Sequence, residues 1–129
     1  LEFLHRFTAR RLTGDHVPYF IEAWPEGAGS MRQLSAESGL YCRILTEGLF
    51  GIRPTGFRSF ELTPSLPTAW NRAALRRIRA FGSLFDLELC RIAPKQIRVT
   101  VSQPGCKPQI FNIKPETSLN ITLKQSSIN

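Results

Sequence analysis

The chain has 129 residues, of which 42% are hydrophobic and nine are Phe, enough for one unit with its own core. It contains no apolar run long enough to cross a bilayer and no signal-peptide pattern, so we expect no membrane partner. The net charge of +7 would suit a nucleic-acid-binding protein, but the basic residues are spread out and not interleaved with aromatic residues, so we expect no nucleic-acid partner.

Three cysteines are present, so at least one thiol is unpaired within the chain. No CxxC spacing occurs, and the sequence therefore predicts no metal site, no dithiol redox motif and no cofactor. Cys42 and Cys90 lie within apolar patterns and are expected to be buried. A disulfide between Cys90 and Cys106 is left open by the sequence.

The first part of the chain reads as helical. Residues 2–12 repeat apolar side chains at helical spacing, a Gly-rich and aromatic-rich loop follows, and a second helix begins with Ser35 as N-cap and continues to Gly48. Apolar side chains cover much of the circumference of that helix, so it should have neighbours on more than one side. Because the chain also opens on Leu1 rather than Met, we expect it to be a piece of a longer protein that supplies the missing helices. Exposed helix faces would also allow an oligomer to form.

After Gly51 the apolar period changes from helical to two. Clean alternation, as in 84–90 and 97–101, is typical of antiparallel strands with one wet face, and turn-rich segments separate the strands. The segment "LRRIRAF" alternates less cleanly, as either a strand with a bulge or a strand that carries Arg side chains to a sheet edge. We therefore expect a mainly β fold, an antiparallel β-sandwich over residues 53–129 preceded by a helical segment over residues 1–52.

The junction between the two parts carries a family resemblance. A helix ends in "GLFGIRP", a strand follows, and then come "PSLPTAW" and strands joined by a Phe-Gly turn. This order resembles the carboxyl-terminal end of six-hairpin glycosidases, the (α/α)6-barrel enzymes, over most of residues 16–92. The resemblance implies that residues 1–52 are the last helices of such a barrel. Trp70 is then either a core residue of the β domain or a platform for a sugar ring.

The resemblance implies that the parent protein is a glycoside hydrolase acting on an oligo- or polysaccharide. Such enzymes use two carboxyl groups, which in this architecture come from loops at one rim of the barrel. The loop before the last helix offers Glu22 and Glu37 as catalytic candidates and Trp24 and Gln33 as contacts to the sugar. A short phosphate-binding loop found in related phosphorylases has no counterpart here, which favours hydrolysis over phosphorolysis.

Each candidate also has a structural interpretation. Glu37 suits the first turn of a helix, Glu22 suits a solvated loop, and Trp24 suits a packing role. Because the other barrel helices are missing, this chain should be inactive alone and should act as a structural cap. The alternative function is a carbohydrate-binding or protein-interaction β-sandwich module, which would need exposed aromatic side chains on a sheet face. The sequence leaves the location open, with a secreted or periplasmic parent as one option.

Overall fold

The computed structural model describes residues 42–125. The chain divides into two units, Leu1–Leu45 and Thr46–Asn129, and all of the strands belong to the second. The helix expected over residues 2–12 lies outside the described residues, as do the start of the helix expected from Ser35 and the barrel to which both were assigned. Those expectations stay predictions.

The described part contains one short helical turn and seven strands. The turn is π-helical and has no buried residue. The elements are η1 (Ile44–Leu49), β1 (Ile52–Gly56), β2 (Ser59–Leu62), β3 (Arg72–Ala80), β4 (Ser83–Ala93), β5 (Gln96–Ser102), β6 (Gln109–Ile113) and β7 (Leu119–Thr122).

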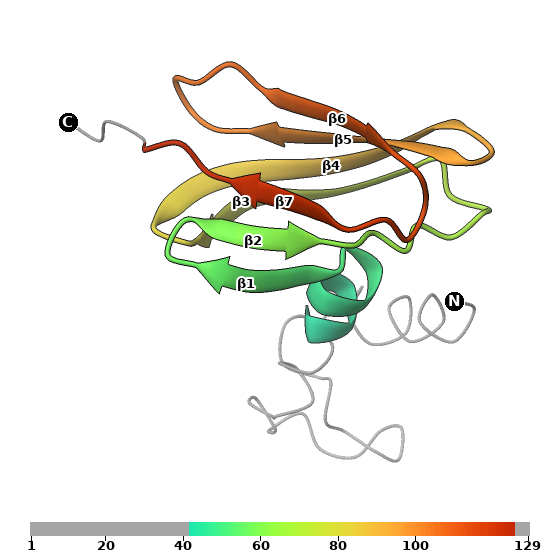
Figure 1. Ribbon diagram of the computed structural model, residues 1–129, viewed down its shortest axis with the longest axis horizontal. Helices are drawn as coiled ribbons and strands as arrows, with labels where there is room; N and C mark the ends of the chain where they lie inside the picture. Colours follow the sequence, from blue (N-terminus) through green and yellow to red (C-terminus); the bar gives the residue numbers. More distant parts are fainter. Residues whose placement is uncertain (1–41, 126–129) are drawn as a thin grey trace, which may run out of the picture. The chain divides into compact units, whose positions relative to one another are not determined.

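The strands form two sheets in which every neighbouring pair is antiparallel. One sheet has the order β1-β2-β7 and the other has the order β3-β4-β5-β6 (Figure 1). The chain builds a hairpin in the first sheet, passes through a connector at residues 63–71, forms a four-stranded meander, and returns so that β7 pairs with β2. The mainly β, antiparallel part of the sequence prediction is confirmed.

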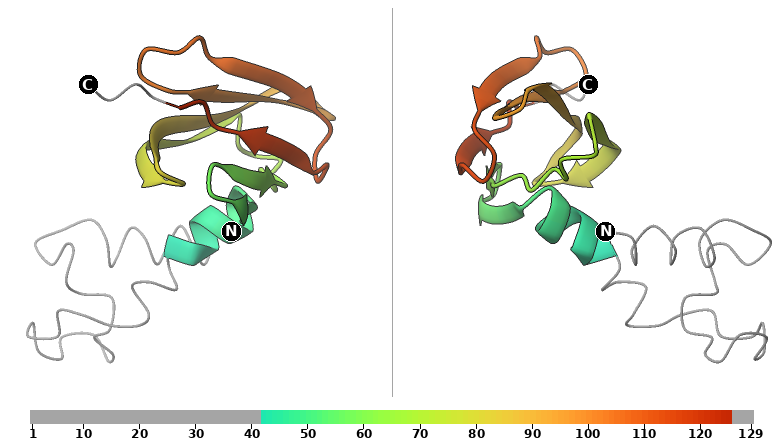
Figure 2. Two further views of the ribbon diagram at one scale, coloured as in Figure 1. Left: turned by 60° about the vertical axis from the view of Figure 1, so that its left-hand side comes forward. Right: turned by 90° about the vertical axis from the view of Figure 1, so that its right-hand side faces the viewer.

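Figure 2 shows the two sheets from two further directions. One apolar core lies between them. Strands β4 and β5 alternate as the sequence predicted, so that one side of each faces this core and the other side is more exposed. Trp70 is partly buried and packs against the core. The fully buried side chains from both sheets include Phe60, Leu62, Phe85, Leu87, Leu89, Ile97, Val99, Val101 and Ile121.

Three phenylalanine rings tie the sheets together at one end of this core. Phe60 of β2 stacks on Phe81 at a centroid distance of 5.0 Å and on Phe85 of β4 at 5.6 Å. Phe81 and Gly82 form the two-residue turn between β3 and β4, and both have positive φ, 54° and 64°, as a type I′ turn requires. A left-handed Phe is unfavourable by about 1–2 kcal/mol, which ring stacking of about 0.5–1.5 kcal/mol per pair offsets.

The chain enters the sheets through a tight junction at Gly51. The Thr63 N–H donates to the Gly51 carbonyl at 3.0 Å, and the Ser65 N–H donates to the Leu49 carbonyl at 2.9 Å. Gly51 has a φ of 67°, and any Cβ there would overlap the Thr63 carbonyl. Only glycine satisfies both conditions, so this position is fixed by the approach of the connector that follows β2.

A buried side-chain amide joins the end of β5 to the chain beyond β7. The Gln103 side-chain N–H donates to the Lys124 carbonyl at 2.9 Å, and the Lys124 N–H donates to the Gln103 side-chain oxygen at 2.8 Å. Gln103 is 6% exposed, and both bonds are partly buried. The amide thus replaces a pair of main-chain ladder bonds and links the two sheets.

Two sequence expectations about cysteine are wrong. Cys42 is exposed, and Cys90 is only partly buried because it shares the parity of Glu88 along β4 and lies on the outer side of the sheet. Cys90 and Cys106 are free thiols, so the bridge left open by the sequence does not form.

Replacing Gly51 by Ala is expected to lower the free energy of unfolding by about 3 kcal/mol or more, because the new methyl group meets main-chain atoms at a left-handed position. Gly48 is the matched control: nothing lies within 4 Å of a Cβ there, so Gly48→Ala should leave stability unchanged or raise it by about 0.5–1 kcal/mol. Urea denaturation of both variants measures the difference, and equal effects would contradict this account of the junction.

Replacing Gln103 by Leu should lower stability by about 2 kcal/mol, since it leaves the partly buried N–H and carbonyl of Lys124 without these partners. The comparison variant is Gln109→Leu, which loses one exposed bond to the Thr122 carbonyl and should cost about 0.5 kcal/mol. Thermal unfolding followed by circular dichroism ranks the two, and a larger loss in Gln109→Leu would refute the role given to Gln103.

Candidate functional site

The site residues predicted from sequence do not fall in the described part of the chain. Glu22, Trp24, Gln33 and Glu37 all lie within residues 1–41. Their assignment to catalysis and sugar contact therefore stays a prediction. The site described here was not among those candidates.

Seven of the charged side chains of residues 42–125 lie on the outer side of the four-stranded sheet. Strand register places Arg72, Cys90, Arg98 and Asn112 in one row across the four strands, and Ala74, Glu88, Thr100 and Ile110 in the next. Asp86 follows two residues before Glu88 and pairs with Ser102. We call this surface the arginine face, defined by Arg72, Arg76, Arg77 and Arg79 of β3, Asp86 and Glu88 of β4, and Arg98 of β5.

A bulge in β3 brings two consecutive arginines to the surface. Leu75 pairs with Leu87 and Ile78 pairs with Phe85, so Arg76 and Arg77 together stand opposite Asp86. The bulge allows Leu75 and Ile78 both to pack against the core although three positions separate them. Both sequence alternatives for "LRRIRAF" are thus confirmed: the strand has a bulge, and it carries Arg side chains along a sheet edge.

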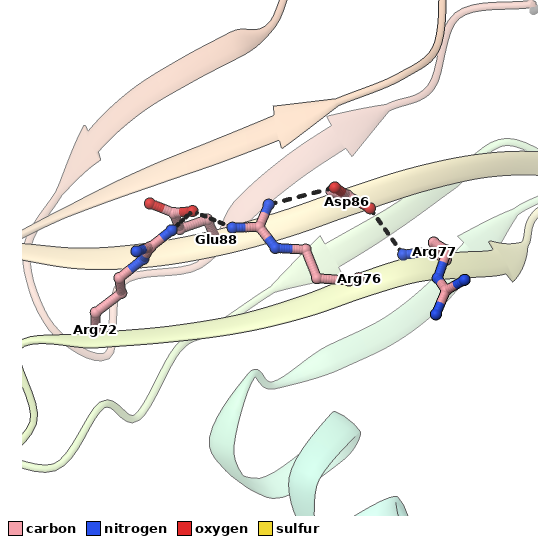
Figure 3. Close-up of polar contacts among 5 residues, drawn as sticks. All are labelled: Arg72, Arg76, Arg77, Asp86 and Glu88. Atoms are coloured by element: carbon pink, nitrogen blue, oxygen red, sulfur yellow. Dashed lines mark hydrogen bonds and ion pairs between the residues drawn. The ribbon is translucent and has the colours of Figure 1, made fainter.

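The bulged residue Arg77 has a φ of 54°, a conformation that residues other than glycine seldom adopt. Its main-chain N–H donates to Asp86 Oδ1 at 2.7 Å, while its guanidinium extends away from that carboxylate (Figure 3). Asp86 therefore supplies an acceptor for Arg77 N–H, which stabilises the bulge.

Arg76 connects the two carboxylates of β4. Its guanidinium donates to Asp86 Oδ2 at 3.3 Å through one terminal nitrogen and to Glu88 Oε2 at 2.6 Å through the other (Figure 3). Arg72 donates to the same Glu88 oxygen at 2.6 Å. The result is a chain of charge-assisted hydrogen bonds along the surface of β3 and β4.

These contacts lower the pKa of both carboxyl groups below their ordinary range. For Asp86 the main cause of the lower pKa is the main-chain N–H of Arg77, and the Arg76 guanidinium adds to it. For Glu88 the main cause is the hydrogen bond from Arg72, with a further contribution from Arg76, and the pKa of Arg72 is raised in return. Both carboxylates are ionised at neutral pH.

Ionised, arginine-bound carboxylates do not suit acid catalysis. A glycosidase needs one carboxyl group that stays protonated near neutral pH, which requires a raised pKa. The pKa values of Asp86 and Glu88 are shifted in the opposite direction.

Among residues 42–125 no group of three or more His, Cys, Asp or Glu side chains is arranged to hold a metal ion. None of the helices in that range is both long and apolar enough for a membrane span.

A shallow depression of about 340 Å³ adjoins the arginine face at the end of the sheet. Arg77, Asp86 and Ser102 contribute its polar lining, and Leu84 and Pro104 contribute apolar atoms. It offers hydrogen-bond donors and acceptors but no aromatic platform other than the buried Phe85.

Arg91 has a structural role that the sequence did not reveal. Its guanidinium donates to the main-chain carbonyls of Leu66 at 2.8 Å and Pro67 at 3.0 Å, with longer bonds of 3.4 Å to those of Trp70 and Pro94. Arg91 therefore holds the connector at residues 63–71 against β4 by hydrogen bonds. The alternation of β4 shows only that Arg91 follows the apolar positions, so no local signal indicates these partners.

Comparisons of this chain with protein families, with curated proteins and with solved structures find no match.

The lowered pKa values predict the pH dependence of stability. A carboxyl group with a lower pKa in the folded chain stabilises the fold at pH values above its unfolded pKa of about 4, and this contribution is lost as the pH falls through the folded value. The thermal midpoint should therefore fall in acid, and Glu88→Gln should be less stable at pH 7 with a flatter profile between pH 5 and pH 2.

Arg76→Gln should flatten the same profile, because Arg76 contacts both carboxylates. Thermal unfolding of the three proteins in buffers of constant ionic strength makes the comparison. If the plots of thermal midpoint against pH for the two variants ran parallel to that of the unchanged protein, these contacts would not lower the pKa of the carboxyl groups.

Proposed function

We propose that this chain is the carboxyl-terminal part of a glycoside hydrolase, in which the two-sheet unit is a non-catalytic cap joined to the end of a helical barrel. The parent enzyme hydrolyses glycosidic bonds in an oligo- or polysaccharide. The chain by itself is inactive, and the catalytic carboxyl groups belong to the helical part and its loops, where Glu22 and Glu37 are the candidates in this sequence.

The observation that carries the proposal is the contact between the two segments on which the resemblance depends. "GLFGIRP" contributes Leu49 and Gly51, and "PSLPTAW" contributes Ser65, next to Thr63. The Ser65 N–H donates to the Leu49 carbonyl and so joins these segments, and Thr63, directly before the second segment, approaches closely enough to require Gly51. Motif residues that are separate in the sequence thus form one junction between a helical turn and a sheet, as a fixed cap requires.

The chemistry of the described residues also supports a structural role. The arginine face offers no carboxyl group suited to proton donation, since both of its carboxylates are bound by arginines. A cap supplies stability and leaves the reaction to other residues. In this arrangement Trp24 and Gln33 would contact the sugar from the loop that enters the last helix.

The alternative of a carbohydrate-binding module that stacks sugar rings on aromatic side chains has less support. Modules of that kind present aromatic rings on a sheet face, whereas Phe60, Phe85 and Phe111 belong to the core or pack against it. Phe57 is 77% exposed, but it lies in the turn between β1 and β2, under the Arg58 guanidinium. One ring at a turn does not form a sugar platform in the described part of the chain.

Two measurements test the proposal. The coding sequence on the 5′ side of the Leu1 codon should continue in frame for several hundred codons of helical repeats, and the protein made from the whole frame should release sugar from chromogenic glycosides. The 129-residue chain should release none. An initiation codon directly before Leu1, or glycosidase activity in the short chain that Asp86→Asn abolishes, would overturn the proposal.

A further inference from the structure

The arginine face carries more positive charge than its own carboxylates neutralise. Arg72 and Arg76 share Asp86 and Glu88 between them. The other three arginines, Arg77, Arg79 and Arg98, are exposed and make no ion pair with any described residue. Their charge is available to a ligand.

Protection of a sheet edge explains part of this pattern. β3 is an edge strand, and charged side chains on such a strand discourage edge-to-edge association. That explanation covers Arg72, Arg76, Arg77 and Arg79. It does not cover Arg98, because β5 lies between β4 and β6 and has no free edge.

The face also mixes donors with acceptors. Arg98 shares its row with Asn112, and Glu88 shares the next row with Thr100, so two neighbouring rows carry guanidinium, amide, carboxylate and hydroxyl groups. Cys90 and the apolar side chains of Ala74 and Ile110 lie in the same rows. Neighbouring strands are about 4.8 Å apart, so these groups form a shallow grid rather than a pocket. Such a grid can contact an extended polymer that carries both carboxylate and hydroxyl groups.

We propose that the arginine face binds a linear acidic polysaccharide, of the kind built from uronic acid residues. Arg79 and Arg98 hold carboxylates of the polymer, and Asp86, Glu88 and Thr100 accept hydrogen bonds from its hydroxyl groups. This binding is separate from the proposed glycosidase function, since it needs only the described sheet and no residue of the helical part.

Nucleic acid fits the same face less well. Recognition of single strands depends on aromatic rings that stack on bases, and strand register puts no aromatic residue in the rows of this face. A duplex presents a dense row of phosphates, which Asp86 and Glu88 would repel. A polymer with hydroxyl groups between its charges uses those two carboxylates as acceptors.

The test measures binding of the full 129-residue chain to polygalacturonate by isothermal titration at low salt. We expect binding that weakens as salt is added, no binding to neutral dextran, and weaker binding to double-stranded DNA at equal charge concentration. Arg79→Gln combined with Arg98→Gln should weaken polygalacturonate binding about threefold to tenfold, as two exposed ion pairs would.

The matched control is Arg53→Gln combined with Lys124→Gln, which removes the same charge from exposed positions on the three-stranded sheet and the chain beyond it. This control should change the affinity by less than a factor of two. Equal weakening by both double variants would show that net charge alone attracts the polymer and would overturn the proposal. Tighter binding of DNA than of polygalacturonate, or no binding of polygalacturonate at low salt, would also overturn it.

Discussion

The burial of one apolar core between two sheets is the constraint on which the rest of this structure depends. The three-stranded sheet contributes Phe60 and Ile121 to that core, and the four-stranded sheet contributes Phe85 and the apolar positions of β4 and β5. An isolated sheet of either kind would leave its apolar side in water. The stack of Phe60, Phe81 and Phe85 joins the sheets directly, so the unfavourable left-handed conformation of Phe81 persists in the turn.

Main-chain groups at the crossings between sheets receive their partners in three ways. Gly51 allows two backbone segments to contact each other directly. Arg91 donates hydrogen bonds to carbonyl groups of the connector. The Gln103 side chain bonds to both the N–H and the carbonyl of Lys124, as a neighbouring strand would. In each case, main-chain N–H or carbonyl groups outside the strands form hydrogen bonds without a partner strand. These interactions fix the path of the chain between layers, which the core alone does not specify.

The outer side of the four-stranded sheet combines stability with accessible charge. Arg72 and Arg76 lower the pKa of Glu88, whereas the Arg77 N–H, with a smaller contribution from Arg76, lowers the pKa of Asp86. The bond from the Arg77 N–H to Asp86 also stabilises the bulge. The bulge keeps Leu75 and Ile78 packed against the core, and it leaves Arg77 exposed. The bulge in β3 thereby keeps the core packed and places charged side chains on an edge strand. The same side chains add positive charge to the surface that we infer to bind an acidic polymer.

The sequence by itself determined β4 and β5, because alternation with period two is a local consequence of burying one side of a strand, and it indicated β3 less cleanly. It did not predict β1, a five-residue edge strand with Pro54 inside it and no buried side, and it placed the candidate site on residues outside the described part. Only the tertiary structure decided the pairing of β7 with β2, the contacts of Arg91 and Gln103, and the bonding of Asp86 to the bulge. Those features join residues far apart in the chain, or depend on register, and no local pattern of residues encodes them.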